Sequence, residues 1–316
     1  MTPRPASLPL FAVLAMLIAC QPSSPDRPSP QAAASPAPAA SPDDPPPPPA
    51  RRIVSFIPAM TEIAFDLGLG PRLVGVSTFD VHPPEVASLE KVGGVLDPNL
   101  EKTLALQPDL ILSTPSIKGI EALARDRNIP IVLTRTDSLQ DVFTAYADLG
   151  RAANVPDRAR DRIAALKAHL DRARAAHQGP RPKVLLVVGR DQNALSGLYG
   201  AGPGSFLDEL LTIAGGDNVL PPSVGKWPQL SLEGLLQYPP DLIIEFAPDG
   251  VDSPDELQQS RETWRSLPAL QAARDGRVHR LTGNHLLLPG PRLTLTVDAL
   301  QRALASTPPA DPPHTP

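Results

Sequence analysis

The sequence predicts an α/β protein with two Rossmann-like lobes, each built on a mainly parallel sheet, and one long helix that bridges them. Three observations support this. Short β-branched runs alternate with helical patterns from residue 51 onward, and the alternation restarts after a long helical stretch. In addition, the sequence of residues 99–112 aligns with that of residues 231–244 without a gap. Two copies of one unit, separated by a helix, indicate two similar lobes rather than a solenoid.

The first lobe is predicted over residues 51–152. We expect strands at residues 52–56, 73–76, 109–112 and 131–134, and helices at residues 61–67, 117–127 and 139–152, with a short helix between Asn99 and Pro108. The strands are short runs of β-branched and other apolar residues, bounded by turn formers. Pro130 stands directly before the last strand and favours extended chain there.

The bridging segment is predicted over residues 153–179, and most of it is one helix from Pro156 to His177. Pro156 suits a first turn, and Gly179 followed by Pro180 closes the helix. At 1.5 Å per residue this helix would span about 30 Å, which is the width of a small domain. Its charged face and its stripe of Ala, Leu and Ile suit a helix that lies along both lobes.

The second lobe is predicted over residues 180–306. We expect strands at residues 183–188, 242–246 and 277–281, and helices at residues 205–214, 262–267 and 293–305, with a short helix after Ser231. Asn99 and Ser231 are N-cap residues of the repeated unit, and Glu101 and Glu233 fall in the first turn of its helix. A cleft between two such lobes is a usual place for a ligand.

The N-terminal residues predict a lipoprotein signal at residues 1–20 and a tether rich in Pro and Ala at residues 21–50. The apolar run at residues 8–18 is too short for a comfortable membrane span. It ends in Leu-Ile-Ala-Cys20, which resembles the bacterial lipobox and so implies cleavage before Cys20 and acylation of that residue. The alternative is a plain signal peptide with a stray cysteine. Residues 307–316 are a second Pro-rich segment, expected to be a disordered tail.

We therefore expect a periplasmic or otherwise extracytoplasmic protein, held by lipid at the cell membrane or the outer membrane. The net charge of −5 comes from mixed basic and acidic residues, so nucleic acid and a charged membrane surface are not expected partners. The single cysteine excludes an internal disulfide and a Cys-rich metal site. The histidines lack the spacing of a metal pair, and no nucleophile or carboxylate pair stands in a catalytic motif, so we expect neither a metal site nor an enzyme.

Several segments resemble the periplasmic cobalamin-binding proteins of bacterial ABC importers. These belong to a wider family that binds cobalamin, haem and iron-siderophores in two lobes bridged by a long helix. The resemblance lies in residues 53–65, 73–84, 92–112 and 226–233, and the Leu-Glu and Trp-Pro-Gln-x-Ser-x-Glu elements are the most specific. It extends over roughly residues 51–305, and it implies cobalamin as a transported ligand rather than a cofactor.

The resemblance also implies roles for individual residues. Glu101 and Glu233 match the glutamates that dock on arginines of the permease dimer, which works with its ATPase subunits. Each could instead only stabilise a helix N-terminus. Phe79 and Trp227 match aromatic positions that flank the corrin. A family tryptophan before the first docking glutamate is missing here, because Val95 and Leu96 stand near its place.

Three more ligand contacts are expected on loops of the cleft. Pro58 and Ala59 lie on the loop next to Phe79, and His285, beside Asn284, follows the last predicted strand. His285 could supply an axial or polar contact. Trp264 is expected to pack inside the second lobe.

Three alternatives stay open. The same fold could bind haem or a ferric siderophore, with Tyr199 or Met60 as an axial haem ligand. The chain could also be a corrinoid-binding lipoprotein without a transport role. An enzyme is the alternative from another class. In the preferred interpretation the partners are the permease dimer, its ATPase subunits, a corrinoid, and the membrane through the lipid anchor alone.

Overall fold

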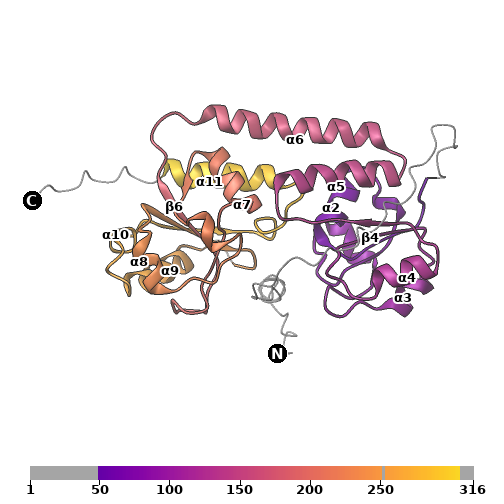
Figure 1. Ribbon diagram of the computed structural model, residues 1–316, viewed down its shortest axis with the longest axis horizontal. Helices are drawn as coiled ribbons and strands as arrows, with labels where there is room; N and C mark the ends of the chain where they lie inside the picture. The colour runs from indigo at the N-terminus through magenta and orange to yellow at the C-terminus, as the bar shows by residue number, and fades with distance from the viewer. Residues whose placement is uncertain (1–48, 251–252, 307–316) are drawn as a thin grey trace, which may run out of the picture.

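The computed structural model describes residues 49–250 and 253–306 as two α/β lobes (Figure 1). The predicted signal sequence with Cys20, nearly all of the tether and the C-terminal tail lie outside the described residues. Among the described helices, none combines the length and apolarity needed to cross a bilayer.

The N-terminal lobe contains a fully parallel sheet in the order β3-β2-β1-β4-β5. Its strands are β1 (Ile53–Ser55), β2 (Leu73–Val76), β3 (Glu90–Lys91), β4 (Leu110–Ser113) and β5 (Ile131–Leu133). Its helices are α2 (Pro58–Asp66), α3 (Leu100–Ala105), α4 (Ile120–Asp126) and α5 (Leu139–Ala152), with 3₁₀ turns at Gly70–Arg72 and Pro84–Ser88. Parallel strands need crossover connections, and the helices between them supply these.

The C-terminal lobe has the order β10-β9-β6-β7, with β8 also paired to β6. The strands are β6 (Lys183–Gly189), β7 (Tyr199–Gly200), β8 (Asp217–Asn218), β9 (Leu242–Ala247) and β10 (Val278–Thr282). The helices are α7 (Phe206–Ala214), α8 (Leu232–Gln237), α9 (Pro254–Arg265), α10 (Gln271–Arg274) and α11 (Leu293–Ala305), with a 3₁₀ turn at Pro222–Val224. Among the described strands of this lobe, β7 alone runs antiparallel to its neighbour.

Helix α6 (Pro156–Ala176) lies across both lobes, along the top of Figure 1. It packs on α5 of the N-terminal lobe and on α7 and α11 of the C-terminal lobe. The side-chain amide of Gln301 donates a hydrogen bond of 2.8 Å to the carbonyl of Ala173, and His169 Nε2 lies 2.9 Å from Asp298 Oδ1. The bridging helix predicted from the sequence is confirmed as part of the fold.

One hydrophobic core continues through both lobes beneath these helices. Ile53 and Leu110 of the first sheet belong to the same buried cluster as Val184 and Leu242 of the second. Residues of α5, α6, α7 and α11 join the two halves of this cluster. The lobes therefore share an apolar interior on the side that α6 covers.

The repeated unit has the same place in both sheets. It forms α3 and β4 in the first lobe and α8 and β9 in the second, and β4 and β9 each pair with the first strand of their lobe. The Asn99 side chain accepts a hydrogen bond of 2.8 Å from the amide of Lys102, and Ser231 Oγ accepts one of 3.0 Å from the amide of Gly234. Both predicted N-caps are thus confirmed.

Three predicted helix starts were wrong, and one of them is that of α4, which begins at Ile120 rather than at residue 117. Helix α9 begins at Pro254 rather than at residue 262, because Ser253 caps it and Pro254 takes the first helical position. Helix α2 begins at Pro58 rather than at residue 61, because proline is suited to a first turn even though Ile57 provides no side-chain cap. The two-residue strands β3, β7 and β8 and the short helix α10 had no sequence prediction, because such pairs carry no periodic pattern.

Candidate ligand cleft

The two lobes meet through loops that follow the carboxyl ends of parallel strands. Helix α2 follows β1 in the first lobe, and residues 283–292 follow β10 in the second. A side chain built on Gly290 would place its Cβ 3.9 Å from the Cα of Ala59. Ligand sites of open α/β sheets lie outside the carboxyl ends of the strands. The candidate cleft is therefore the space bordered by these loops.

A buried ion pair joins the lobes at this point. Nε of Arg292 lies 2.9 Å from Oε2 of Glu62, and Nη2 of Arg292 lies 2.5 Å from Oε1. The Glu62 side chain is 3% exposed and that of Arg292 is 15% exposed. Nη1 of Arg292 also donates a hydrogen bond of 2.7 Å to the side chain of Asn284. We call Glu62 and Arg292 the interlobe ion pair.

A second contact between the lobes lies near α7. The backbone amide of Leu139, the first residue of α5, donates a hydrogen bond of 3.2 Å to Oε2 of Glu209. Burial raises the pKa of Glu209. The free amide at the N-terminus of α5 thus has a partner in the other lobe.

His285 is near enough to His82 of the other lobe for an electrostatic interaction. Burial lowers the pKa of His285, and the positive charges of Arg292 and His82 lower it further. His82 follows β2 of the N-terminal lobe, whereas His285 follows β10 of the C-terminal lobe. The structure therefore brings together two histidines that are scattered in the sequence, and it favours a neutral imidazole at His285.

Phe79 is half-buried on the loop after β2. Its ring lies against Gly94, where a Cβ would approach the Phe79 Cε2 to 2.4 Å. Two large apolar side chains of the same loops face solvent, since Val81 is 63% exposed and Leu96 is 61% exposed. The loops around Phe79 thus present apolar surface without an occupant from the described residues.

Asp80 directly follows Phe79 and is buried. Burial raises the pKa of Asp80 to about 6, while the hydroxyls of Thr61 and Ser77 and the charge of Lys91 act in the opposite direction. A carboxyl group with such a pKa changes its charge near neutral pH. Asp80 lies on the same loop as Phe79, which is a proposed ligand contact.

Trp227 is half-buried on the loop after β8. Its ring packs on Phe206 with a centroid distance of 5.8 Å and an interplanar angle of 54°. The glycine-rich loop before α7 pairs with this segment, because the amide of Gly202 donates a hydrogen bond of 2.7 Å to the carbonyl of Lys226. Phe206 and this pairing hold the Trp227 ring at the surface of the lobe.

Two further predicted contacts lie on α2. Pro58, the first residue of the helix, is half-buried. Ala59 is buried, and its backbone lies next to Gly290 of the other lobe. Pro58 therefore has exposed surface for a ligand, whereas Ala59 is covered by protein.

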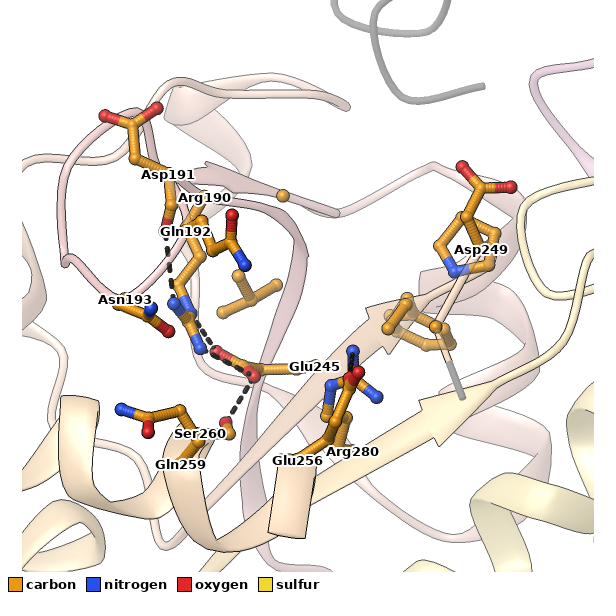
Figure 2. A pocket seen from close by; sticks show the side chains of 16 residues that line it. Arg190, Asp191, Gln192, Asn193, Glu245, Asp249, Glu256, Gln259, Ser260 and Arg280 are labelled. Atoms are coloured by element: carbon orange, nitrogen blue, oxygen red, sulfur yellow. Dashed lines mark hydrogen bonds and ion pairs between the residues drawn. The ribbon is translucent and has the colours of Figure 1, made fainter. Parts of the chain in front are cut away.

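A cavity of about 520 Å³ lies at the carboxyl ends of β6, β9 and β10 (Figure 2). Its floor holds Glu245, a nearly buried carboxylate of β9. Nε of Arg190 lies 2.5 Å from Oε1 of Glu245, Nε1 of Trp264 donates to the same oxygen at 2.7 Å, and the Ser260 hydroxyl donates to Oε2. Trp264 packs inside the lobe, and its indole N–H has the partner that burial requires.

The rim of this cavity is polar. It carries a second ion pair, Arg280 with Glu256, and the uncharged amides of Gln192, Asn193 and Gln259. None of the five predicted ligand contacts lines this cavity. This cavity was not predicted from the sequence, although charged residues closely follow two apolar strands. Arg190 and Asp191 follow β6, and Asp249 follows β9 after Pro248.

Glu101 and Glu233 are exposed in the first turns of α3 and α8. Leu232 and Leu236 of α8 are also partly exposed. Both carboxylates are thus open to solvent at matching points of the two lobes. Within residues 49–250 and 253–306, no group of three His, Cys, Asp or Glu side chains is arranged to hold a metal ion.

The sequence matches the periplasmic binding protein family over residues 53–281. The uncharacterised ABC transporter substrate-binding lipoprotein YvrC of Bacillus subtilis is 30% identical over 264 residues, which are 80% of this chain and 80% of YvrC. The vitamin B12-binding protein of Pectobacterium atrosepticum is 30% identical over 266 residues, which are 81% of this chain and 88% of that protein.

Solved structures agree with this. The periplasmic vitamin B12-binding protein BtuF of Vibrio cholerae has a TM-score of 0.67 and 26% identity, over 81% of this chain and 97% of that one. A periplasmic haem-binding protein of Pseudomonas aeruginosa has a TM-score of 0.67 and 28% identity, over 84% of this chain and 96% of that one. The chain thus belongs to the periplasmic binding protein family, as a substrate-binding protein of an ABC importer in the group that includes vitamin B12- and haem-binding proteins.

Proposed function

We propose that this chain captures cobalamin or a related corrinoid in the cleft between its lobes and delivers it to a permease dimer with ATPase subunits. The main support for the proposal is the position of two aromatic residues, Phe79 and Trp227. Each aromatic ring is half-buried on a loop, Phe79 after β2 of the N-terminal lobe and Trp227 after β8 of the C-terminal lobe. Flat rings on both sides of a cleft suit a large flat macrocycle, because they bury apolar area at a small cost in side-chain entropy.

The surroundings of these rings support an apolar ligand. Val81 and Leu96 extend exposed apolar surface beside Phe79. Exposed apolar side chains beside an aromatic ring can add apolar contact area for a ligand. Leu96 stands near the place of the missing family tryptophan, so it would supply apolar contact there without ring stacking.

The test is calorimetric titration of the purified full chain with cobalamin, haem and a panel of ferric siderophores. We expect cobalamin or another corrinoid to bind, and Trp227→Ala and Phe79→Ala each to weaken it about tenfold or more. Phe143→Ala is the matched control, because Phe143 is a half-buried ring on α5 that packs against Lys167. Absence of corrinoid binding by the parent chain would reject the ligand assignment.

Haem is the second candidate, and the proximity of His82 and His285 favours it. A neutral imidazole such as that of His285 can serve as an axial ligand of haem iron. Of the other candidates for that role, Tyr199 is half-buried and Met60 is fully buried in the core. Haem binding that shifts the absorption spectrum and is lost in His285→Ala would favour haem over a corrinoid.

Delivery and anchoring complete the proposal. We assign Glu101 and Glu233 to permease docking, because the two exposed carboxylates match the requirement of a two-fold partner. We assign Cys20 to lipid attachment, which would hold the chain at the extracytoplasmic face of a membrane with residues 21–50 as the tether.

A further inference from the structure

We infer that the cavity at the carboxyl ends of β6, β9 and β10 is a subsite for uncharged carboxamide groups of the ligand, and that it rejects carboxylates. The inference rests on the proposed function, because it concerns groups at the edge of a corrinoid held in the cleft. A corrinoid carries neutral acetamide and propionamide arms, whereas haem carries two propionate carboxylates. The cavity would therefore act in the choice between these ligands.

The cavity lies at the same edge of the sheet as the loop that meets the N-terminal lobe. Arg280 of β10 lines the cavity, and β10 ends two residues later at Thr282. The loop that follows carries His285 and ends at Arg292 of the interlobe ion pair. Groups of a ligand in the cleft can thus reach the cavity along the carboxyl ends of the same sheet.

The residues that line the cavity carry more carboxylates than basic groups. Arg190 and Arg280 are its basic residues, and each forms an ion pair with a glutamate of the lining. Asp191 and Asp249 add two more carboxylates, both at exposed positions of the rim (Figure 2). An entering carboxylate would meet like charges, whereas a neutral amide would not.

Three side-chain amides provide the complementary groups. Gln192, Asn193 and Gln259 line the cavity, and the described residues supply no hydrogen-bond partner for their side chains. Each such group has an N–H₂ donor and a carbonyl acceptor. A primary carboxamide of the ligand can therefore form reciprocal hydrogen bonds with them, and a cavity of about 520 Å³ has room for more than one arm.

The experiment compares cobalamin with its monocarboxylates, in which one peripheral propionamide is hydrolysed to a carboxylate. Each isomer is titrated separately into the full chain by calorimetry at pH 7.5. We expect at least one isomer to bind about tenfold or more weakly than cobalamin. In the double variant Asp191→Asn/Asp249→Asn this difference should fall to threefold or less, which is about a third of the parent value or below.

The matched control is Asp157→Asn/Asp171→Asn, which removes two exposed carboxylates from α6, neither of which lines the cavity. It should keep the parent preference. Equal binding of cobalamin and all isomers by the parent, or an unchanged preference in Asp191→Asn/Asp249→Asn, overturns the inference while leaving the proposed function intact. Failure of the parent to bind cobalamin at all rejects the proposed function, and the inference with it.

Discussion

The interlobe ion pair should be a main determinant of stability, and Arg292→Met tests this directly. The variant leaves the Glu62 carboxylate, which is 3% exposed, without its bidentate partner, and it also removes the donor to Asn284. Loss of one member of a buried ion pair costs about 3–5 kcal/mol, because the remaining charge is desolvated and unpaired. For a folded region of this size the lower value corresponds to a fall in Tm of roughly 6–12 °C.

The assay is urea unfolding of the full chain, followed by circular dichroism, as a double-mutant cycle. The cycle compares Glu62→Met, Arg292→Met and the double variant. We expect the double variant to be more stable than either single variant, since it buries two apolar side chains and no unpaired charge. Arg174→Met is the matched control, because Arg174 forms an exposed ion pair with Asp171 on α6 and such pairs contribute about 0–1 kcal/mol.

One result would refute this reasoning. If Arg292→Met lowers the free energy of unfolding no more than Arg174→Met does, the ion pair does not hold the lobes together. Additive effects of the two single substitutions would lead to the same conclusion, because a coupled pair must give a non-additive cycle.

The other predictions concern a buried acid, the docking carboxylates and the anchor. The folded-state pKa of Asp80 is about 6, against 3.8 ordinarily, so its contribution to stability is complete below pH 3.8 and is lost as pH rises through 6. Asp80→Asn should therefore be more stable than the parent by about 3 kcal/mol at pH 8 and equal to it at pH 3.5, and a pH series of urea midpoints measures this. The double variant Glu101→Lys/Glu233→Lys should keep ligand affinity, because its helix-dipole penalty is about 1 kcal/mol or less per site, yet lose uptake and co-purification with the permease. Normal uptake by this variant would contradict the docking role. Cys20→Ser should release the chain from membranes and change its electrophoretic mobility, and an unchanged membrane fraction would contradict the anchor.

The sequence predicted those elements whose signals are local. Helices α5 and α11 and strand β2 have the expected bounds. The Ser138 capping box marks the start of α5, apolar periodicity marks α11, and a short apolar run marks β2. The predicted fold and family are confirmed, and the repeated unit was visible because its N-cap, first-turn glutamate and proline recur at one spacing. Helix α9 was placed too late because the Ser-Pro signal at Ser253 was overlooked.

The site was less predictable because it depends on contacts between distant segments. Glu62 and Arg292 are 230 residues apart, and neither lies in a sequence motif that predicts an ion pair. The cavity combines the ends of three strands with α9, so its charge balance exists only in the folded chain. Phe79 and Trp227 were chosen by family resemblance alone, and their roles stay predictions.

The core that α5, α6, α7 and α11 share has a consequence for how the chain unfolds. Buried side chains of both sheets belong to one apolar cluster, so neither half can lose its packing without exposing part of the other. The chain should therefore melt as one cooperative unit, with equal calorimetric and van't Hoff enthalpies. Ligand bound at the cleft would then raise the melting temperature of the whole chain, although it contacts only a small part of each lobe, because binding to the native state shifts the single equilibrium that both halves share.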